Sequence, residues 1–410
     1  MKKFLKGLCI VALSASVAVA GPEPTSKDLK KVVEDNGIYV ETAQKGVVLS
    51  GYVDTSYTYQ FASHTGGTAQ GNDENVLRQF DTKNNDFNIN AFKLTLEKAL
   101  SDKNEWSAGF RADLMFGEDA TILAASDPAT SPGGDLFLEQ AYVSLRVPVG
   151  NGLDFKVGKF VTLLGYEIIE SPGNLNFSRG LLFTNAIPLT HTGVLASYKF
   201  NDIFDAQFGV VNNWNGSDKL ANQDAPAITG RFAVNSPGGN ATLATSFIYS
   251  PTGEATTPGA PSAGSVTNTN NFVVDVWGQW YPTCVPDKKL LLAFNADYGF
   301  AESNSLVTSG GGDPVNPGTS EWYGVAAYAK YQFTPVFSLA SRGEFLHTDD
   351  GYKFGLPGLG TDVWSYTLTA GFNIWENVLT RVEYRYDRGE ADTINGFDQH
   401  QIAVNVVYSF

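Results

Sequence analysis

Cysteine and charge are scarce in this chain. Its 410 residues include 2 cysteines and 2 methionines, and charged residues make up 17%. Cys9 lies in an apolar N-terminal stretch, which leaves Cys284 without a partner for an internal disulfide. The formal net charge of −15 argues against a general nucleic-acid binder, whose surface must be basic. We therefore expect no nucleic-acid partner, no metal centre and no cofactor.

Long apolar runs are missing after Ala20. No later stretch approaches the roughly 20 residues that a membrane-spanning helix needs. The first twenty residues combine three lysines with the apolar stretch LCIVALSASVAVA and small residues before Ala20. This order is typical of a secretory signal peptide, and we expect residues 1–20 to be removed during bacterial export.

Residues 21–46 form a separate segment. The stretch TSKDLKKVVEDNG can make one short helix, capped by Thr25 or Ser26 and ended by Gly37. A plain periplasmic N-terminal tail is the simpler interpretation. A small plug or a contact with the cell wall is the alternative.

Glycine, with 42 residues, and aromatic side chains, with 13%, are abundant and favour strands and tight turns. In VVLSGYVDTSYTYQF, Val53 and Tyr57 fall on one face and Asp54 on the other, and this two-residue period predicts a strand. The chain contains about sixteen such segments in total, many near the ~9–11 residues with which a tilted strand crosses a bilayer. They lie near 47–61, 88–100, 105–116, 136–148, 152–162, 190–200, 205–214, 227–235, 240–250, 271–281, 288–300, 322–333, 336–347, 363–374, 377–388 and 398–410.

The connections between these segments alternate in length. They are short after even-numbered segments, as at 101–104 and 236–239, and mostly long after odd-numbered ones, as at 117–135 and 163–189. Together with the even count, this alternation predicts that 47–410 form an all-β, transmembrane antiparallel β-barrel of about 16 strands. Short periplasmic turns, long extracellular loops and periplasmic N- and C-termini would follow. Soluble β-sandwich domains are the alternative, against which the export signal and the strand lengths argue.

Three stretches carry a family resemblance: LEQAYVSLRVP, LDFKVGKFVTLLGYEIIESPGNLNFSRGLLF and THTGVLASYKF. From about Val47 to Phe410 the chain resembles the outer-membrane β-barrel porins of the OmpL-like type, and more loosely the general porins. The resemblance implies a passive channel in the outer membrane of a Gram-negative-type bacterium, in contact with membrane lipid. A homotrimer is expected from the resemblance to porins. The terminal aromatic strand, with Tyr408 and Phe410, resembles the signal read by the barrel-assembly machinery.

The third long connection, 163–189, breaks the alternation with a mixture of apolar and charged residues. Its apolar side chains need a surface to pack on, and the general porins fold their third long loop into the lumen. We therefore expect this loop to fold inward. It would present a pore constriction, formed by Glu167, Glu170, Asn174, Asn176 and Arg179. A surface loop that latches onto a neighbouring barrel is the alternative.

Charged residues recur on the face of the strands that we expect to line the pore wall. They are Arg111, Asp113, Arg146, Arg231, Arg342, Glu344, Arg381, Glu383 and Arg385. Cross-strand ion pairs that stiffen the wall are one role for them. The other is to filter small polar solutes and ions, with Arg111, Arg381 and Arg385 as the basic side of a constriction whose acidic side is Glu167 and Glu170. The net acidity favours a mild cation preference.

Two other functions are compatible with a barrel. A barrel hydrolase would need histidine with serine or aspartate near the outer rim, and His347 in HTDD lies beside Asp349 and Asp350. No nucleophile motif accompanies it, so we expect no enzyme. A structural or adhesive barrel with a closed pore is the second alternative. For the Gly-rich stretch 304–322 we expect a flexible loop, and a calcium-binding loop is the less favoured alternative.

Overall fold

A computed structural model describes residues 46–65, 78–127, 134–217, 225–251, 268–303, 318–349, 361–391 and 397–410. The predicted signal peptide and the predicted helix within 21–46 lie outside these ranges. Most of the Gly-rich stretch 304–322 also lies outside them.

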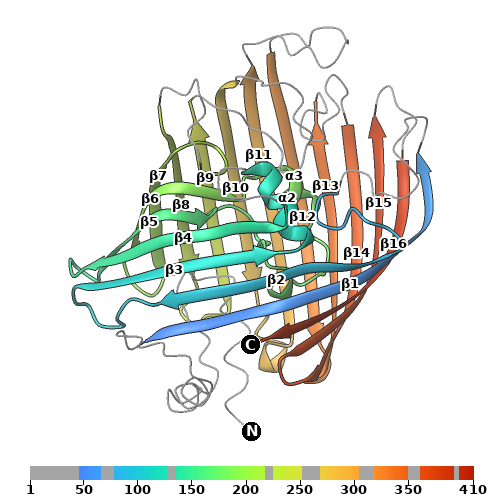
Figure 1. The fold of residues 1–410 in the computed structure, drawn as a ribbon, viewed down its shortest axis with the longest axis horizontal. Helices are drawn as coiled ribbons and strands as arrows, with labels where there is room; N and C mark the ends of the chain where they lie inside the picture. The colour runs from blue at the N-terminus through green and yellow to red at the C-terminus, as the bar shows by residue number, and fades with distance from the viewer. Residues whose placement is uncertain are drawn as a thin grey trace.

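Within the described ranges, sixteen strands form one closed antiparallel barrel. Each strand pairs with its neighbours in sequence, and β1 pairs with β16 to close the ring (Figure 1). The strands are β1 (Val47–Thr65), β2 (Asp86–Lys98), β3 (Ser107–Phe116), β4 (Leu136–Val147), β5 (Leu153–Val161), β6 (Thr190–Lys199), β7 (Phe204–Val211), β8 (Ala227–Asn235), β9 (Ala241–Ser250), β10 (Asn268–Trp280), β11 (Leu290–Ser303), β12 (Gly318–Gln332), β13 (Phe337–Thr348), β14 (Thr361–Trp375), β15 (Val378–Ala391) and β16 (Phe397–Ser409). The predicted fold class is confirmed.

Strand boundaries differ from the prediction mainly at the long-loop end. The weakly patterned segment 227–235 is indeed β8, with the same bounds. In contrast, β1 continues to Thr65 and β12 begins at Gly318, within stretches predicted as loops. Polar residues there still pair along the ladder, as Thr65 does with Phe397. Apolar alternation marks only the lipid-facing part of a strand, so the sequence pattern ends before the hydrogen-bonded ladder does.

The two faces of each strand have opposite chemistry. On β16, Ile402, Val404 and Val406 point outward and are 38–45% exposed, while Gln401 and Asn405 point inward and are buried. On β13, Arg342 and Glu344 likewise point inward. An apolar outer face with a polar interior is the arrangement of a barrel that lies in lipid.

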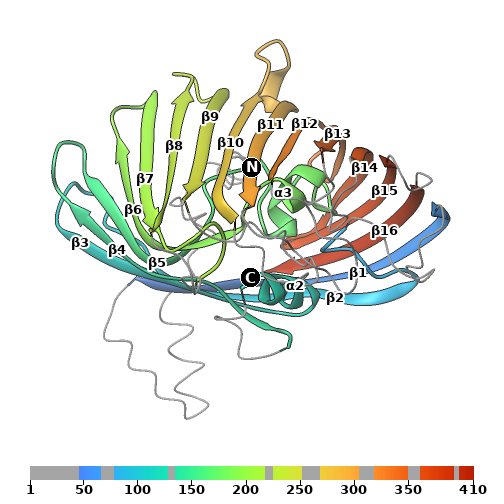
Figure 2. The same ribbon diagram turned by 90° about the horizontal axis from the view of Figure 1, so that it is seen from above.

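Two short helices lie on the inner side of the ring of strands (Figure 2). The helix α2 (Glu118–Ser126) contacts β2, β3 and β4, whereas α3 (Leu181–Asn185) contacts β12 and β13. Two 3-10 turns are η3 (Ser171–Gly173), between β5 and β6, and η4 (Pro286–Lys288), between β10 and β11. None of the described helices has the length and apolarity needed to span a bilayer.

Candidate functional site

The connection between β5 and β6, residues 162–189, is called loop 3 below, and it lies inside the barrel. It contains η3 and α3. The apolar side chains of loop 3, which were expected to need a surface to pack on, are buried. Leu164, Ile169 and Phe177 are 3% exposed, and Leu181 and Leu182 are 2% exposed. The inward position of the loop therefore follows from burial of its apolar side chains, which is the dominant driving force for packing.

Arg342 on β13 forms an ion pair with Glu167, the first charged residue of loop 3. Arg342 Nη1 lies 2.7 Å from Glu167 Oε1 and donates a hydrogen bond to the Ser178 carbonyl oxygen at 2.6 Å. On β15, the Glu383 carboxylate accepts hydrogen bonds from the backbone N–H groups of Phe177 (2.6 Å) and Ser178 (3.0 Å). Charged wall residues thus satisfy backbone groups that the irregular loop leaves unpaired.

Two further arginines of β15 bind loop 3 through its carbonyl oxygens. Arg381 donates to the carbonyls of Ser171 (2.9 Å) and Asn176 (3.0 Å), and Arg385 donates to that of Arg179 (2.8 Å). Both guanidinium groups are buried, at 2% exposure. These two arginines were predicted to form the basic side of a constriction, and the structure instead places them beneath the loop as its anchors.

The tip of loop 3 reaches the opposite wall. Glu170 forms an ion pair with Lys93 on β2, and the same ammonium lies 2.9 Å from Glu139 and 3.1 Å from Asp113. Burial by itself would raise the pKa of Glu170, but the attraction of Lys93 and Arg111 and hydrogen bonds to the carboxylate lower it to about 2. The tip is therefore held against the β2–β4 wall by an ionised carboxylate.

Two other connections contact loop 3 through their described residues: loop 1, which joins β1 to β2 (residues 66–85), and loop 2, which joins β3 to β4 (residues 117–135). In loop 2, Asp119 at the start of α2 lies 2.5 Å from Arg179, and burial raises the pKa of Asp119 to about 6 despite that partner. In loop 1, Arg78 pairs with Asp387 of β15 at 2.7 Å, and Phe80 lies against the Arg179 guanidinium. The described contacts of the three loops therefore cover the inner wall at β11 to β13, at β15 and at β2 to β4.

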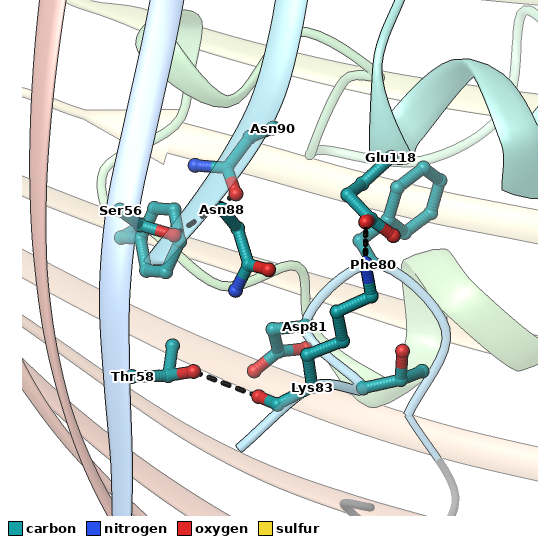
Figure 3. Close-up of a pocket in the computed structure, with 10 residues that line it drawn as sticks. Ser56, Thr58, Phe80, Asp81, Lys83, Asn88, Asn90 and Glu118 are labelled. Carbon is teal, nitrogen blue, oxygen red and sulfur yellow. Dashed lines mark hydrogen bonds and ion pairs between the residues drawn. The ribbon is translucent and has the colours of Figure 1, made fainter. Parts of the chain in front are cut away.

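A small cavity of about 10 Å³ remains where loop 1 meets β1 and β2. Figure 3 shows its polar lining, with Ser56 and Asn90 on the strands and Lys83 reaching Glu118. This is room for about one water molecule.

Inward charged side chains fall into two groups by exposure. Those under the loops are at most 4% exposed, and include Arg342, Glu344, Arg381, Glu383 and Arg385. Those at the short-turn end of β2 to β8 have side chains that are 10–33% exposed: Glu97, Arg111, Arg146, Asp154, Asp205 and Arg231. The second group forms cross-strand pairs, such as Arg146 with Asp154 (2.7 Å) and Arg231 with Asp205 (3.0 Å).

The five predicted constriction residues also fall into two groups by exposure. Glu170 has a 22% exposed side chain, and Asn174 is half-buried at the tip. Glu167, Asn176 and Arg179 are 5%, 1% and 3% exposed. The contacts of these three buried residues hold loop 3 in place. Whether any of the five filters solutes stays a prediction.

Sequence reasoning missed several residues of the site, above all Lys93, Glu139 and Asp119. Lys93 falls on the inward face of its strand, and a charged residue at an inward position of an apolar segment was the available signal. Lys156 also points inward, with Nζ 4.7 Å from the centre of the Tyr142 ring. Within the described ranges, no carboxylate lies within ion-pair distance of Lys156.

The histidines do not build a hydrolytic site in the described part of the chain. His347 lies on the outward face, where Nδ1 is 2.5 Å from Asp362, and Asp349 instead accepts a hydrogen bond from the Glu321 backbone. His191 is fully buried beside Thr162, and His400 contacts the Tyr384 hydroxyl. The side chain of His64 and all of Asp350 lie outside what the structure describes.

Solved structures share this architecture. The outer membrane channel DcaP of Acinetobacter baumannii matches with a TM-score of 0.60 and 14% identity, over 91% of this chain and 99% of its own. The anion-selective porin from Comamonas acidovorans matches with a TM-score of 0.59 and 11% identity, over 89% of this chain and 99% of its own. OmpT of Vibrio cholerae, solved in a trimer form, matches with a TM-score of 0.57 and 11% identity, over 89% of this chain and 99% of its own. At these identities the likeness shows the fold.

The family assignment comes from the sequence. No curated protein sequence matches the chain. Residues 46–410 match the family model described as "Putative beta-barrel porin-2, OmpL-like". With the closed sixteen-stranded barrel and its polar interior, this identifies an outer-membrane diffusion channel. The chain belongs to the OmpL-like β-barrel porin family.

Proposed function

We propose that solutes cross this porin by an off-centre, water-filled path between the tip of loop 3 and the wall formed by β3 to β8. The observation that supports this is the division of the inward charges by exposure. Side chains under loops 1 to 3 are desolvated, whereas those of β2 to β8 at the short-turn end keep contact with water. Ions follow the hydrated wall because desolvating them is costly.

The narrowest part of this path lies where the tip of loop 3 approaches the wall. Glu170 and Asn174 supply its acidic and polar side, and Arg111 and Lys156 supply its basic side. Opposed charges across a water-filled passage orient dipolar solutes and filter ions by sign. The substrates are small hydrophilic solutes and ions, and no catalytic step is involved. Glu167, Asn176 and Arg179 act on permeation indirectly, by fixing the loop.

The experiment that tests this path is cysteine accessibility in a planar bilayer. In a Cys284→Ser background, Gln207→Cys on the exposed wall and Ala340→Cys on the covered wall are treated with a charged thiosulfonate during recording. The path predicts a stepwise loss of conductance for Gln207→Cys and no change for Ala340→Cys. Equal block at both positions would contradict an off-centre path. Folded protein that never conducts would contradict a diffusion channel and favour a closed structural barrel.

We also propose that the barrel forms a homotrimer with both termini on the periplasmic side. The trimer form in which OmpT has been solved supports the first part. The short turns support the second, since outer-membrane barrels carry short turns on the periplasmic side. Chemical cross-linking in isolated outer membranes tests the trimer, and protease accessibility of a tag placed after Phe410 in intact cells tests the orientation.

A further inference from the structure

Two aspartates meet on the inner wall where loop 3 begins. Asp275 on β10 and Asp297 on β11 are direct partners in the strand register, and both side chains point inward. Asp275 is 0% exposed and Asp297 is 5% exposed. Their carboxyl groups share one donor, because the Asn295 amide nitrogen lies within hydrogen-bond distance of an oxygen of each. Two carboxylates offer acceptors and no donor, so a direct hydrogen bond between them requires one proton.

The surroundings do not supply another cation. Within the described ranges, no lysine, arginine or histidine nitrogen lies within 4.0 Å of either carboxyl group. The cation that acts on Asp275 is Arg231 on β8, which is itself paired with Asp205 and lies over the Trp277 ring.

The other groups that face the pair are neutral. Loop 3 contributes Tyr166 and β12 contributes Tyr328, while the inward residues of β9 carry no charge. The Asn295 amide donates to Asp275 Oδ2 (2.6 Å) and to Asp297 Oδ2 (3.2 Å). Each aspartate is left with an Oδ1 atom that no donor reaches. Two adjacent, desolvated carboxylates without a counter-charge cannot both stay ionised.

The same pair holds the first turn of loop 3. Asn295, whose amide nitrogen contacts both aspartates, accepts a hydrogen bond from the Tyr166 N–H at 2.6 Å through its oxygen. The Tyr166 ring then packs against Tyr328 and Trp277, with ring centroids 4.8 and 5.8 Å apart. The charge state of the two aspartates is therefore coupled to the position of the loop.

We propose that Asp275 and Asp297 form a proton-binding site that latches the root of loop 3 and makes the conductance of the channel sensitive to pH. The effect on conductance rests on the proposed function, in which loop 3 bounds the path. With one proton bound, the pair is an acid and a carboxylate that together hold the Asn295 amide, whose oxygen accepts the Tyr166 N–H. Removal of the proton in alkaline solution leaves two facing negative charges, whose repulsion pushes the side chains of Asp275 and Asp297 apart and loosens Asn295 and Tyr166.

Infrared spectroscopy and bilayer recording on the folded, detergent-purified porin test the two parts separately. The wild type should show the carbonyl stretch of a buried carboxylic acid, which disappears on alkaline titration. Open-channel conductance should change over the same pH interval. Asp297→Asn supplies a permanent donor in place of the proton, so this variant should lose both the infrared band and the pH-dependent change in conductance. Asp275→Asn serves as the second variant if Asp297→Asn does not fold.

Asp154→Asn is the matched control, because Asp154 is an inward aspartate that is partly exposed and ion-paired with Arg146. It should keep the band and the pH response. A wild type without the band, or one that binds Ca²⁺ in a calorimetric titration at this pair, overturns the proton site. A band that titrates with no accompanying change in conductance overturns the latch. Absence of any conductance counts against the proposed function instead, because the band is measured without it.

Discussion

Glu167 of loop 3 and Arg342 of β13 form an ion pair of 2.7 Å in which the side chains are 4% and 0% exposed. The same guanidinium lies 2.8 Å from Glu344 and donates to the Ser178 carbonyl. One cation therefore balances two carboxylates and fixes the loop backbone. A buried charge that loses its partner is far more costly than an exposed one.

Arg342→Met should destabilise the barrel strongly, because it leaves Glu167 and Glu344 buried without a cation. The expected loss in the free energy of unfolding is about 3–5 kcal/mol. Arg231→Met is the control, since the pair of Arg231 with Asp205 is partly hydrated and such pairs contribute about 1 kcal/mol or less. Denaturant unfolding of the folded protein in detergent measures both. Equal losses for the two variants would show that burial does not set the strength of these pairs.

Gly158→Ala should prevent normal assembly of the barrel. Gly158 has φ +134, and an added Cβ would lie 2.2 Å from the Ala141 carbonyl oxygen of β4. Backbone strain in this region costs of order 1–3 kcal/mol before the clash is counted. Gly343→Ala is the matched control on β13, where nothing lies within 4 Å of an added Cβ. The yield of heat-modifiable folded barrel on a gel measures the effect, and similar yields for the two variants would contradict it.

The barrel and the inward set of charges were predictable because a strand has a period of two, which assigns every side chain to one of two faces. The inward position of loop 3 was predictable too, since Leu181 and Leu182 had no other surface on which to pack. The two-residue period does not show whether another segment of the chain covers an inward side chain. Arg381 and Arg385 were assigned the correct face, but not the loop carbonyl groups that they bind.

The partners of the loop carboxylates were not predictable for a related reason. Glu167 meets Arg342 and Glu170 meets Lys93 across the lumen, at places set by strand tilt and by the path of the loop. Neither is encoded in a short sequence pattern. The acid pair of Asp275 and Asp297 needed the register of β10 with β11, because a shift of one residue would have placed these side chains on opposite faces.

The ion pair of Glu170 with Lys93 should stabilise the barrel above about pH 4.5 and stop doing so in strong acid. The pKa of Glu170 falls from its usual 4.5 to about 2 in the folded protein, because attraction to Lys93 outweighs the effect of burial. Folding therefore favours the ionised form, and this stabilisation is lost as the pH falls from about 4.5 to about 2. At neutral pH it is at most about 3 kcal/mol.

Glu170→Gln measures this contribution. The difference in the free energy of unfolding between wild type and Glu170→Gln should shrink as the pH falls through that interval. Asp202→Asn is the control, because Asp202 pairs with Lys199 on an exposed turn. The difference in the free energy of unfolding between wild type and Asp202→Asn should stay small over the whole pH interval. A constant difference for Glu170→Gln down to about pH 2 would mean that Glu170 is not held as an ionised partner of Lys93.

Ion selectivity should depend on the hydrated charges and not on the buried ones. Under a salt gradient, Glu170→Gln removes a partly exposed negative charge and should shift the reversal potential toward anions, whereas Lys156→Gln should shift it toward cations. Glu167→Gln changes the same kind of charge at a buried position, so it should leave the reversal potential unchanged while lowering stability. Recordings of purified protein in planar bilayers give all three values. A shift for Glu167→Gln as large as that for Glu170→Gln would place Glu167 on the conducting path and contradict the assignment by exposure.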